Sequence, residues 1–217
     1  MPNILKKEMK LSASIVTYVF MLFGLMFLLP GYPILCGVFF STLGIYKSFE
    51  YANQANDIEF SLLLPISRKD VIKGKYIFVC MIESGTLFIM ILSVLFRMTI
   101  LKDASFYHTN PLMNANLFAL GAACILFGLF NLTFLKGFFK TAYKTGKPFL
   151  IYIILCFLGI CIFEAMHYFP GLERVNAFGM EDMALQVCLF GIGVVFYIIV
   201  SIYSYKKACK QFERIDI

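Results

Sequence analysis

Residues 56–76 read NDIEFSLLLPISRKDVIKGKY and form a polar island between two long apolar stretches. The island carries seven charged side chains among its 21 residues, yet it also holds a tight apolar cluster, Phe60 to Leu64. A loop that only connects two spans has no need of such a cluster, whereas a short helix that presses on a soluble partner needs one. The island therefore predicts a contact helix outside the bilayer.

The composition indicates whether the rest of the chain folds in water or in a lipid bilayer. Hydrophobic residues make up 60% of the 217 residues, charged residues only 15%, and the mean hydropathy is +0.82. A soluble domain carries roughly a quarter charged residues. A membrane helix needs about 20 predominantly apolar residues to cross the hydrocarbon core. We therefore expect an all-α polytopic membrane protein.

Six blocks are long and apolar enough to be transmembrane helices, so residues 1–217 are expected to form a single transmembrane domain. The second block is the weakest because Lys47 and Glu50 mark its end. None of the seven prolines falls inside a block; each lies outside the blocks or at a first residue, where a helix accepts it. The expected spans are about 11–29, 33–49, 76–96, 116–135, 148–168 and 184–204, with a coupling loop at 50–75.

The basic residues predict the orientation. With both termini in the cytoplasm, 16 of the 19 basic residues lie on the inner side, and only Arg97, Lys102 and Arg174 lie outside. This split is a strong positive-inside signal. The net charge of +6 therefore suits anionic lipid at the inner face and gives no reason to expect nucleic acid as a partner.

Two shorter features complete the expected organisation. Residues 1–10 mix apolar and charged side chains in a pattern that suits a short helix lying in the membrane interface. The seven cysteines form no Cys-x-x-Cys pair, so neither a disulfide framework nor a metal site is expected.

The island itself divides at Pro65. Ser67-x-x-Asp70 has the form of a capping box and predicts a helix from Arg68 into the third span. Lys73, Lys75 and Tyr76 would then lie at the lipid interface. Asp57 to Leu64 would form a separate short helix, because Pro65 ends whatever precedes it.

The run Phe60 to Tyr76, FSLLLPISRKDVIKGKY, resembles the cytoplasmic loop of ABC-2 type transporter permeases. The opening Leu5 to Leu11 also looks like theirs. The resemblance, to a protein of six spans with both ends inside the cell, covers essentially the whole chain. Within the family, the small size is most similar to permeases of bacterial exporters for phenol-soluble modulins, which are amphipathic peptide toxins. The resemblance implies a multi-pass protein of the bacterial plasma membrane.

The resemblance also implies a mechanism and partners. Two permeases, either two copies in a homodimer or this chain with a paralogue, would form the pore, each resting on a cytoplasmic ABC ATPase subunit. The short helix would be the coupling helix that passes ATP-driven movement to the spans during export of an amphipathic peptide or lipid-like substrate. The matching positions are Asp57, Glu59, Phe60, Leu62, Leu63, Leu64, Arg68 and Lys69.

ATP must then be handled on another chain. A phosphate-binding P-loop needs two glycines, a lysine and a hydroxyl residue at fixed spacing. Gly74-Lys75-Tyr76 and Gly146-Lys147-Pro148 lack both the upstream glycine and the hydroxyl. We therefore expect no catalytic residue, metal or cofactor on this chain, and ATP with Mg on the partner subunit.

Charged residues inside the spans are candidates for the substrate path, because they are costly there and often functional. These are Glu83 in the third span and Glu164 near the outer end of the fifth. The plainer interpretation of Glu83 is that it pairs with a neighbouring helix or is simply protonated, and the plainer interpretation of Glu164 is that it reaches the outer headgroups. Four lysines at positions 136, 140, 144 and 147 share one face of an expected inner helix, which would anchor anionic lipid or touch the ATPase a second time.

Three other classes of protein are the alternatives. A membrane-embedded enzyme needs a nucleophile motif, paired histidines or aspartates in the spans, and the sequence offers none of them. An ion-coupled carrier often has helices that are interrupted at matching positions of its two halves. The sequence shows no such pair of interrupted spans. An immunity or sensor membrane subunit of an ABC system would share the coupling loop, so the sequence leaves it open.

Overall fold

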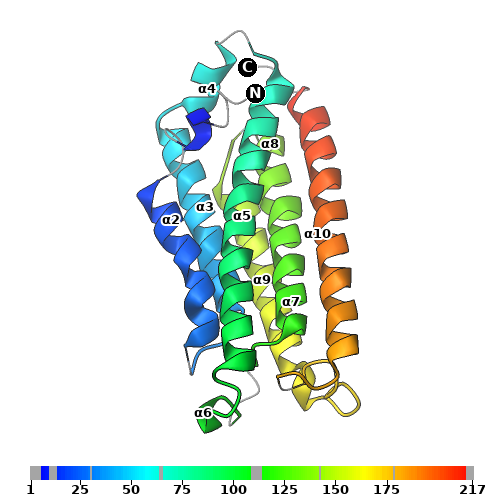
Figure 1. Ribbon diagram of the computed structural model, residues 1–217. Coiled ribbons are helices and arrows are strands. Elements are labelled where there is room, and N and C mark those ends of the chain that lie inside the picture. Colours follow the sequence, from blue (N-terminus) through cyan, green and yellow to red (C-terminus); the bar gives the residue numbers. More distant parts are fainter. Residues whose placement is uncertain are drawn as a thin grey trace.

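The computed structural model describes residues 6–9, 14–29, 31–63, 66–108, 114–141, 143–177 and 179–213, without the side chains of residues 58, 62, 106 and 108. Helices connected by turns make up these ranges, and the described part of the chain contains no strand. Figure 1 shows the long helices side by side in one bundle, with α4 (Asp57–Leu62) at one end and α6 (Ser105–His108) at the other.

Six helical segments run along the bundle. They are α2–η2 (Ile15–Met21 and Leu22–Leu28), α3 (Cys36–Gln54), α5 (Arg68–Thr99), α7–η4–α8 (Leu117–Phe130, Asn131–Leu135 and Lys136–Lys140), α9–η5 (Gly146–Ala165 and Met166–Tyr168) and α10 (Met183–Phe212).

Four of these segments are long and apolar enough to cross a membrane by length and composition: α5, α7–η4–α8, α9–η5 and α10. The segment α2–η2 is a shorter apolar helix of 14 residues, and α3 is not among the four. Six spans and cytoplasmic termini therefore remain predictions.

The first segment gains length from its winding. Its second half, η2, is a 3₁₀-helix of seven residues, which rises about 2.0 Å per residue instead of 1.5 Å. The 14 residues of α2–η2 therefore extend about 25 Å, compared with about 21 Å for an α-helix of equal length. This brings a short apolar segment close to the thickness of the hydrocarbon core.

The helix α7 and its continuation lie at the centre of the bundle, where 72% of their most apolar window is buried. Phenylalanine fills this centre: Phe134 contacts the rings of Phe49 and Phe130, and Tyr152 meets Phe130 edge to face at 4.9 Å. By contrast, only 11% of the apolar window of α10 is buried. The exposed apolar face of α10 is what a membrane helix presents to lipid.

Close packing of α7 on α10 depends on glycine. A Cβ added to Gly121 would lie 2.8 Å from the Leu189 carbonyl oxygen, and one added to Gly193 would overlap the backbone of Gly121. Small residues at such crossings let two membrane helices approach closely.

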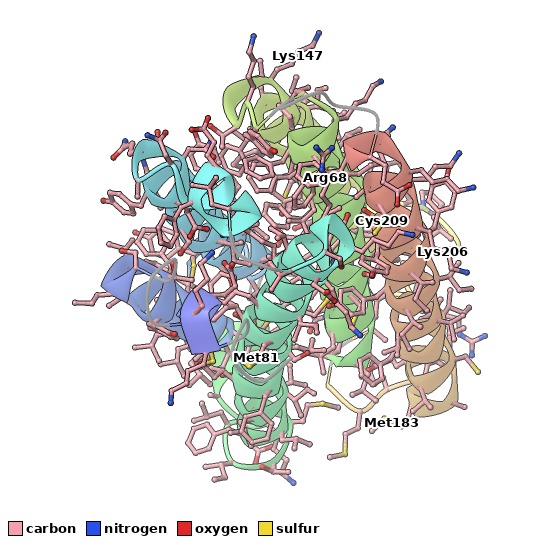
Figure 2. The ribbon with its side chains drawn as sticks, turned by 90° about the horizontal axis from the view of Figure 1, so that it is seen from above. Arg68, Met81, Lys147, Met183, Lys206 and Cys209 are labelled. Carbon is pink, nitrogen blue, oxygen red and sulfur yellow. The ribbon has the colours of Figure 1, made fainter. Side chains whose placement is uncertain are left out.

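The lysine-bearing inner helix predicted over residues 136–147 is wrong. The helix α8 ends at Lys140, Tyr143 has a left-handed φ of 69°, and α9 begins at Gly146. A left-handed residue cannot continue a helix, so the four lysines are divided between two elements. Lys140, Lys144 and Lys147 are exposed at the α4 end of the bundle. Figure 2 looks down on this end and shows Lys147 and Lys206 at its rim.

Candidate functional site

The short helix α4 is set off from α3 by a sharp turn. Asn56 stands between them in the left-handed conformation, with φ 49° and ψ 34°, which asparagine tolerates better than most residues. One turn earlier, the Asn53 side chain donates to the Tyr143 carbonyl oxygen at 2.6 Å and ties the turn to the α8–α9 connection. The predicted short helix is therefore present, as Asp57–Leu62.

One face of α4 is polar and points into the protein. The Asp57 carboxylate pairs with Lys7 at 2.6 Å and with Lys75 at 2.9 Å. One turn further on, Ser61 is buried, and its hydroxyl accepts from the ammonium of Lys7. Asp57 and Ser61 are four residues apart and therefore share this face.

Lys75 is the centre of the charged cluster. Its side chain is 2% exposed, its ammonium pairs with Glu8 at 2.7 Å as well as with Asp57, and it lies 5.6 Å from the ring centre of Phe49. Glu8 is 1% exposed and also lies 3.5 Å from Lys7. Two lysines and two carboxylates thus balance in a mostly buried network, the inner ion cluster, formed by Lys7, Glu8, Asp57 and Lys75.

The inner ion cluster joins residues 6–9 to two consecutive helices much later in the chain, α4 and α5. Burial by itself would raise the pKa of Asp57, but the adjacent Lys75 and Lys7 outweigh it and hold that pKa below the ordinary 3.8. Asp57 is therefore charged at neutral pH. Removing one member of a buried pair costs about 3–5 kcal/mol, because a desolvated charge is left alone.

The opposite face of α4 is apolar and exposed. Phe60 is 60% exposed and Leu63, at the helix end, is 84% exposed; they lie three residues apart and so share a face. Glu59 is exposed beside them. This arrangement inverts that of a helix on the surface of a soluble protein, which buries its apolar face. We call the exposed residues Glu59, Phe60 and Leu63 the α4 outer face.

Ser67 is the N-cap of α5, as the predicted capping box requires. The Ser67 hydroxyl accepts from the Asp70 amide at 3.1 Å and donates to the Asp70 carboxylate at 2.6 Å, and the helix begins at Arg68. The start of α5 contacts the end of α10: Arg68 lies 6.0 Å from the ring centre of Phe212, and Lys69 pairs with Glu213 at 3.1 Å. Figure 2 shows Arg68 well inside the rim of this end.

The structure therefore divides the predicted coupling residues. Glu59, Phe60 and Leu63 lie on the α4 outer face, Asp57 lies on the inner face, and Arg68 and Lys69 lie at the start of α5. The side chain of Leu62 and all of Leu64 lie outside the described residues.

The expectation that Lys75 and Tyr76 lie at the lipid interface is wrong. Both are buried, with Lys75 in the inner ion cluster and the Tyr76 hydroxyl 2.7 Å from that of Ser204 on α10. Sequence reasoning missed this because the partners, Glu8 and Ser204, are 67 and 128 residues away. The one signal in the sequence was Glu8 itself, an acidic residue within a lysine-rich opening.

The two substrate-path candidates lie outside this cluster, with Glu83 about two turns beyond Lys75 on α5 and Glu164 on α9. Glu83, on α5, is 1% exposed and accepts from Asn131 at 3.0 Å and from Tyr197 at 2.7 Å. Sequence reasoning did not single out these two partners.

Glu164 lies at the other end of the bundle. It is 6% exposed, and its carboxylate accepts from the Leu35 amide at 3.0 Å, at the first turn of α3. A carboxylate at this position satisfies a free amide and complements the helix dipole. In this structure Glu164 is therefore turned toward α3 and not toward the headgroups.

The family profile of ABC-2 family transporter proteins matches residues 3–208, nearly the whole chain. The chain therefore belongs to the ABC-2 transporter family and is an integral membrane protein with the place of a permease subunit in an ABC system. Members of this family generally pair with a cytoplasmic ABC ATPase. Neither a search of curated proteins nor one of solved structures found a match.

Proposed function

We propose that this chain is the transmembrane subunit of an ATP-driven exporter, and that α4 is the element that couples it to a separate ATPase subunit. The observation that carries the proposal is the inverted polarity of α4. Its Asp57 carboxylate is paired inside the protein, and its apolar side chains Phe60 and Leu63 are presented outward beside Glu59. Burying each such side chain in a partner is worth roughly 1.5–3 kcal/mol.

The route from this contact to the spans is the inner ion cluster. Asp57 on α4 is held to Lys75 on α5, and α5 runs for 32 residues through the bundle. Residues 6–9 brace the same lysine through Glu8. Because the pairs are buried, a push on α4 is transmitted to α5 and does not merely tilt a loose loop.

Family membership supports a separation of ATP binding and transport between two subunits. We propose that ATP and Mg are bound by the partner, and that this chain is not itself an enzyme. A second permease, as another copy or as a paralogue, would complete the pore in a bacterial plasma membrane. The phenylalanine-rich interior supports an amphipathic peptide or lipid-like cargo better than a hydrated ion.

The docking proposal is tested with Phe60→Asp/Leu63→Asp in the tagged full-length chain. Loss of both apolar side chains should weaken ATPase copurification at least 100-fold, since two such contacts together are worth roughly 3 kcal/mol or more. The matched control is Tyr51→Asp, which introduces a charge at an exposed aromatic of α3 outside α4. It should retain the ATPase.

The outcome of this experiment is decisive. An unchanged thermal midpoint with the ATPase lost supports docking at α4. Retention of the ATPase by the double variant, with transport intact, overturns the assignment.

Cargo is tested separately by reconstituting the permease with its ATPase in liposomes. Amphipathic helical peptides should stimulate ATP hydrolysis, and lipid-linked sugars should not. A flat response to peptides removes the peptide-toxin hypothesis but leaves docking untouched. A complex that binds the ATPase without transporting either compound would instead be the sensor or immunity subunit.

A further inference from the structure

A second polar cluster lies deep in the bundle, between α5, η4 and α10. It contains Glu83 from α5, Asn131 from η4, and Tyr197 and Ser201 from α10. Glu83 and Asn131 are 1% and 0% exposed. Asn131 lies at the start of a π-helical turn, an irregularity that often marks functional positions in helices.

The hydrogen bonds to Glu83 are strongly one-sided. The carboxyl oxygen Oε2 accepts from both the Asn131 amide nitrogen and the Tyr197 hydroxyl. The other oxygen, Oε1, has no hydrogen-bond partner within the described part of the protein, and neither does the amide oxygen Oδ1 of Asn131. Two acceptors on one bonded pair of side chains are thus left without a donor.

A carboxylate does not suit this environment. An ionised group buried without a counter-charge is very costly, and an unpartnered buried polar atom adds to that cost. None of the ion pairs among the described residues involves Glu83. The titratable groups that face it are cysteines and tyrosines, which are uncharged in their ordinary form at neutral pH. They are Cys80 on its own helix, Cys124 on α7, Tyr152 on α9, and Tyr197, together with Tyr76 two turns earlier on α5.

One proton resolves both deficits. If Oε1 carries it, Oε1 becomes a hydroxyl that donates to Asn131 Oδ1, while Asn131 Nδ2 donates to Oε2 as observed. The two side chains then form a cyclic pair of carboxylic acid and carboxamide. In this pair Oε2 is the carbonyl oxygen, which explains why it alone accepts hydrogen bonds.

We propose that Glu83 and Asn131 form a proton-binding site inside the bundle, in which Glu83 is a neutral acid at physiological pH. The site links α5 to η4 and, through Asn131 and Tyr197, to α10. A neighbouring link reinforces it, because the Ser204 hydroxyl donates to the Asn131 carbonyl oxygen and also bonds the Tyr76 hydroxyl. Loss of the proton would place a bare charge between these helices and favour their separation.

The test is infrared spectroscopy of the full-length chain, carrying isotope-labelled glutamate, in lipid at neutral pH. The carbonyl band of a protonated carboxylic acid is distinct from that of a carboxylate. We expect an acid band that disappears in Glu83→Gln and persists in Glu164→Gln, the control in another span. A carboxylate at position 83, seen as an acid band unchanged by Glu83→Gln, overturns the proposal.

A swap separates the paired arrangement from a merely neutral Glu83. Glu83→Gln/Asn131→Asp exchanges the acid and the amide and keeps one proton in the ring. We expect its acid band to shift to labelled aspartate and its thermal midpoint to exceed that of Asn131→Leu. An aspartate that is ionised at neutral pH in the swap would show that the site does not hold a proton, and would overturn the proposal. This test does not require the ATPase, so it can fail while the docking proposal stands.

Discussion

At the scale of single residues, the buried position of Lys75 most needs an explanation. A lysine at the start of a membrane helix usually reaches toward headgroups, but this ammonium is withdrawn into contact with two carboxylates. The long side chain is not needed to reach water here. It is needed to reach Glu8 and Asp57 at once, and this makes one residue the meeting point of three segments.

Removing that ammonium should be costly. Lys75→Met leaves the two carboxylates of Glu8 and Asp57 with Lys7 alone to balance them, and we expect a loss of about 3–5 kcal/mol in the free energy of unfolding. The control is Lys69→Met, which removes an exposed lysine of the same helix from its pair with Glu213 and should cost at most about 1 kcal/mol. Thermal melting in detergent compares the two, and equal midpoints would refute the role given to the inner ion cluster.

The depressed pKa of Asp57 predicts a pH dependence with a definite sign. Because its pKa in the folded protein lies below the ordinary 3.8, the stabilisation is fully present above that value and is lost as the pH falls through the lower one. The difference in melting temperature between the wild type and Asp57→Asn should therefore be constant from pH 8 to 5 and shrink below about pH 4. A difference that shrinks already between pH 8 and 6 would contradict this assignment.

At the scale of elements, much was readable from the sequence and some was not. The start of α5 was predictable because Ser67 and Asp70 carry their own local chemistry. The end of α8 was not, because the left-handed Tyr143 is held by contacts from elsewhere, including its carbonyl bond to Asn53. A regular spacing of lysines continues through such a break without revealing it.

The candidate site shows the same limit. The apolar outer face of α4 could be predicted from Phe60 and its neighbours, since the cluster lies within six residues. The inner face could not, because Asp57 finds Lys7 and Lys75 only after the helices have packed. Likewise Glu164 and Leu35 are 129 residues apart, and no local sequence pattern predicts that the Glu164 carboxylate accepts from the Leu35 amide.

The packing of α7 on α10 gives a prediction at this scale. Gly193→Ala would force the two helices apart, because the added carbon overlaps the Gly121 backbone, and overpacking of this kind costs typically about 1–3 kcal/mol. Gly191 lies two residues earlier on the same helix and has open space at its Cβ. Gly191→Ala should therefore be neutral or slightly stabilising, since alanine is the better helix former. Equal melting temperatures for the two variants would show that α7 and α10 do not cross closely at Gly193 in the membrane.

At the scale of the whole molecule, one end of the bundle differs from the other. The α4 end gathers the inner ion cluster, the α4 outer face and the exposed lysines of α8, α9 and α10. Figure 1 shows α4 at this end, and Figure 2 labels Lys147 and Lys206 there. At the far end Arg97 is buried, donates to the Phe27 carbonyl oxygen at 3.0 Å and stacks on Tyr107. The asymmetry agrees with the predicted orientation, in which the α4 end faces the cytoplasm.

Orientation is testable with single cysteines in a variant lacking the seven native ones. Leu63→Cys should react with a membrane-impermeant maleimide in inside-out vesicles and not in intact cells, because Leu63 is exposed at the α4 end. Met180→Cys, exposed at the other end, should show the reverse pattern. Labelling of Leu63→Cys in intact cells would place α4 outside and remove its access to a cytosolic ATPase.

The link between Glu8 and Lys75 also constrains how the protein is made. Glu8 is synthesised 67 residues before Lys75, the lysine whose ammonium will hold it. The ion pair between these two residues can therefore form only after the start of the third apolar stretch has been synthesised. Closure of residues 6–9 onto that stretch is then a late step in the assembly of the fold.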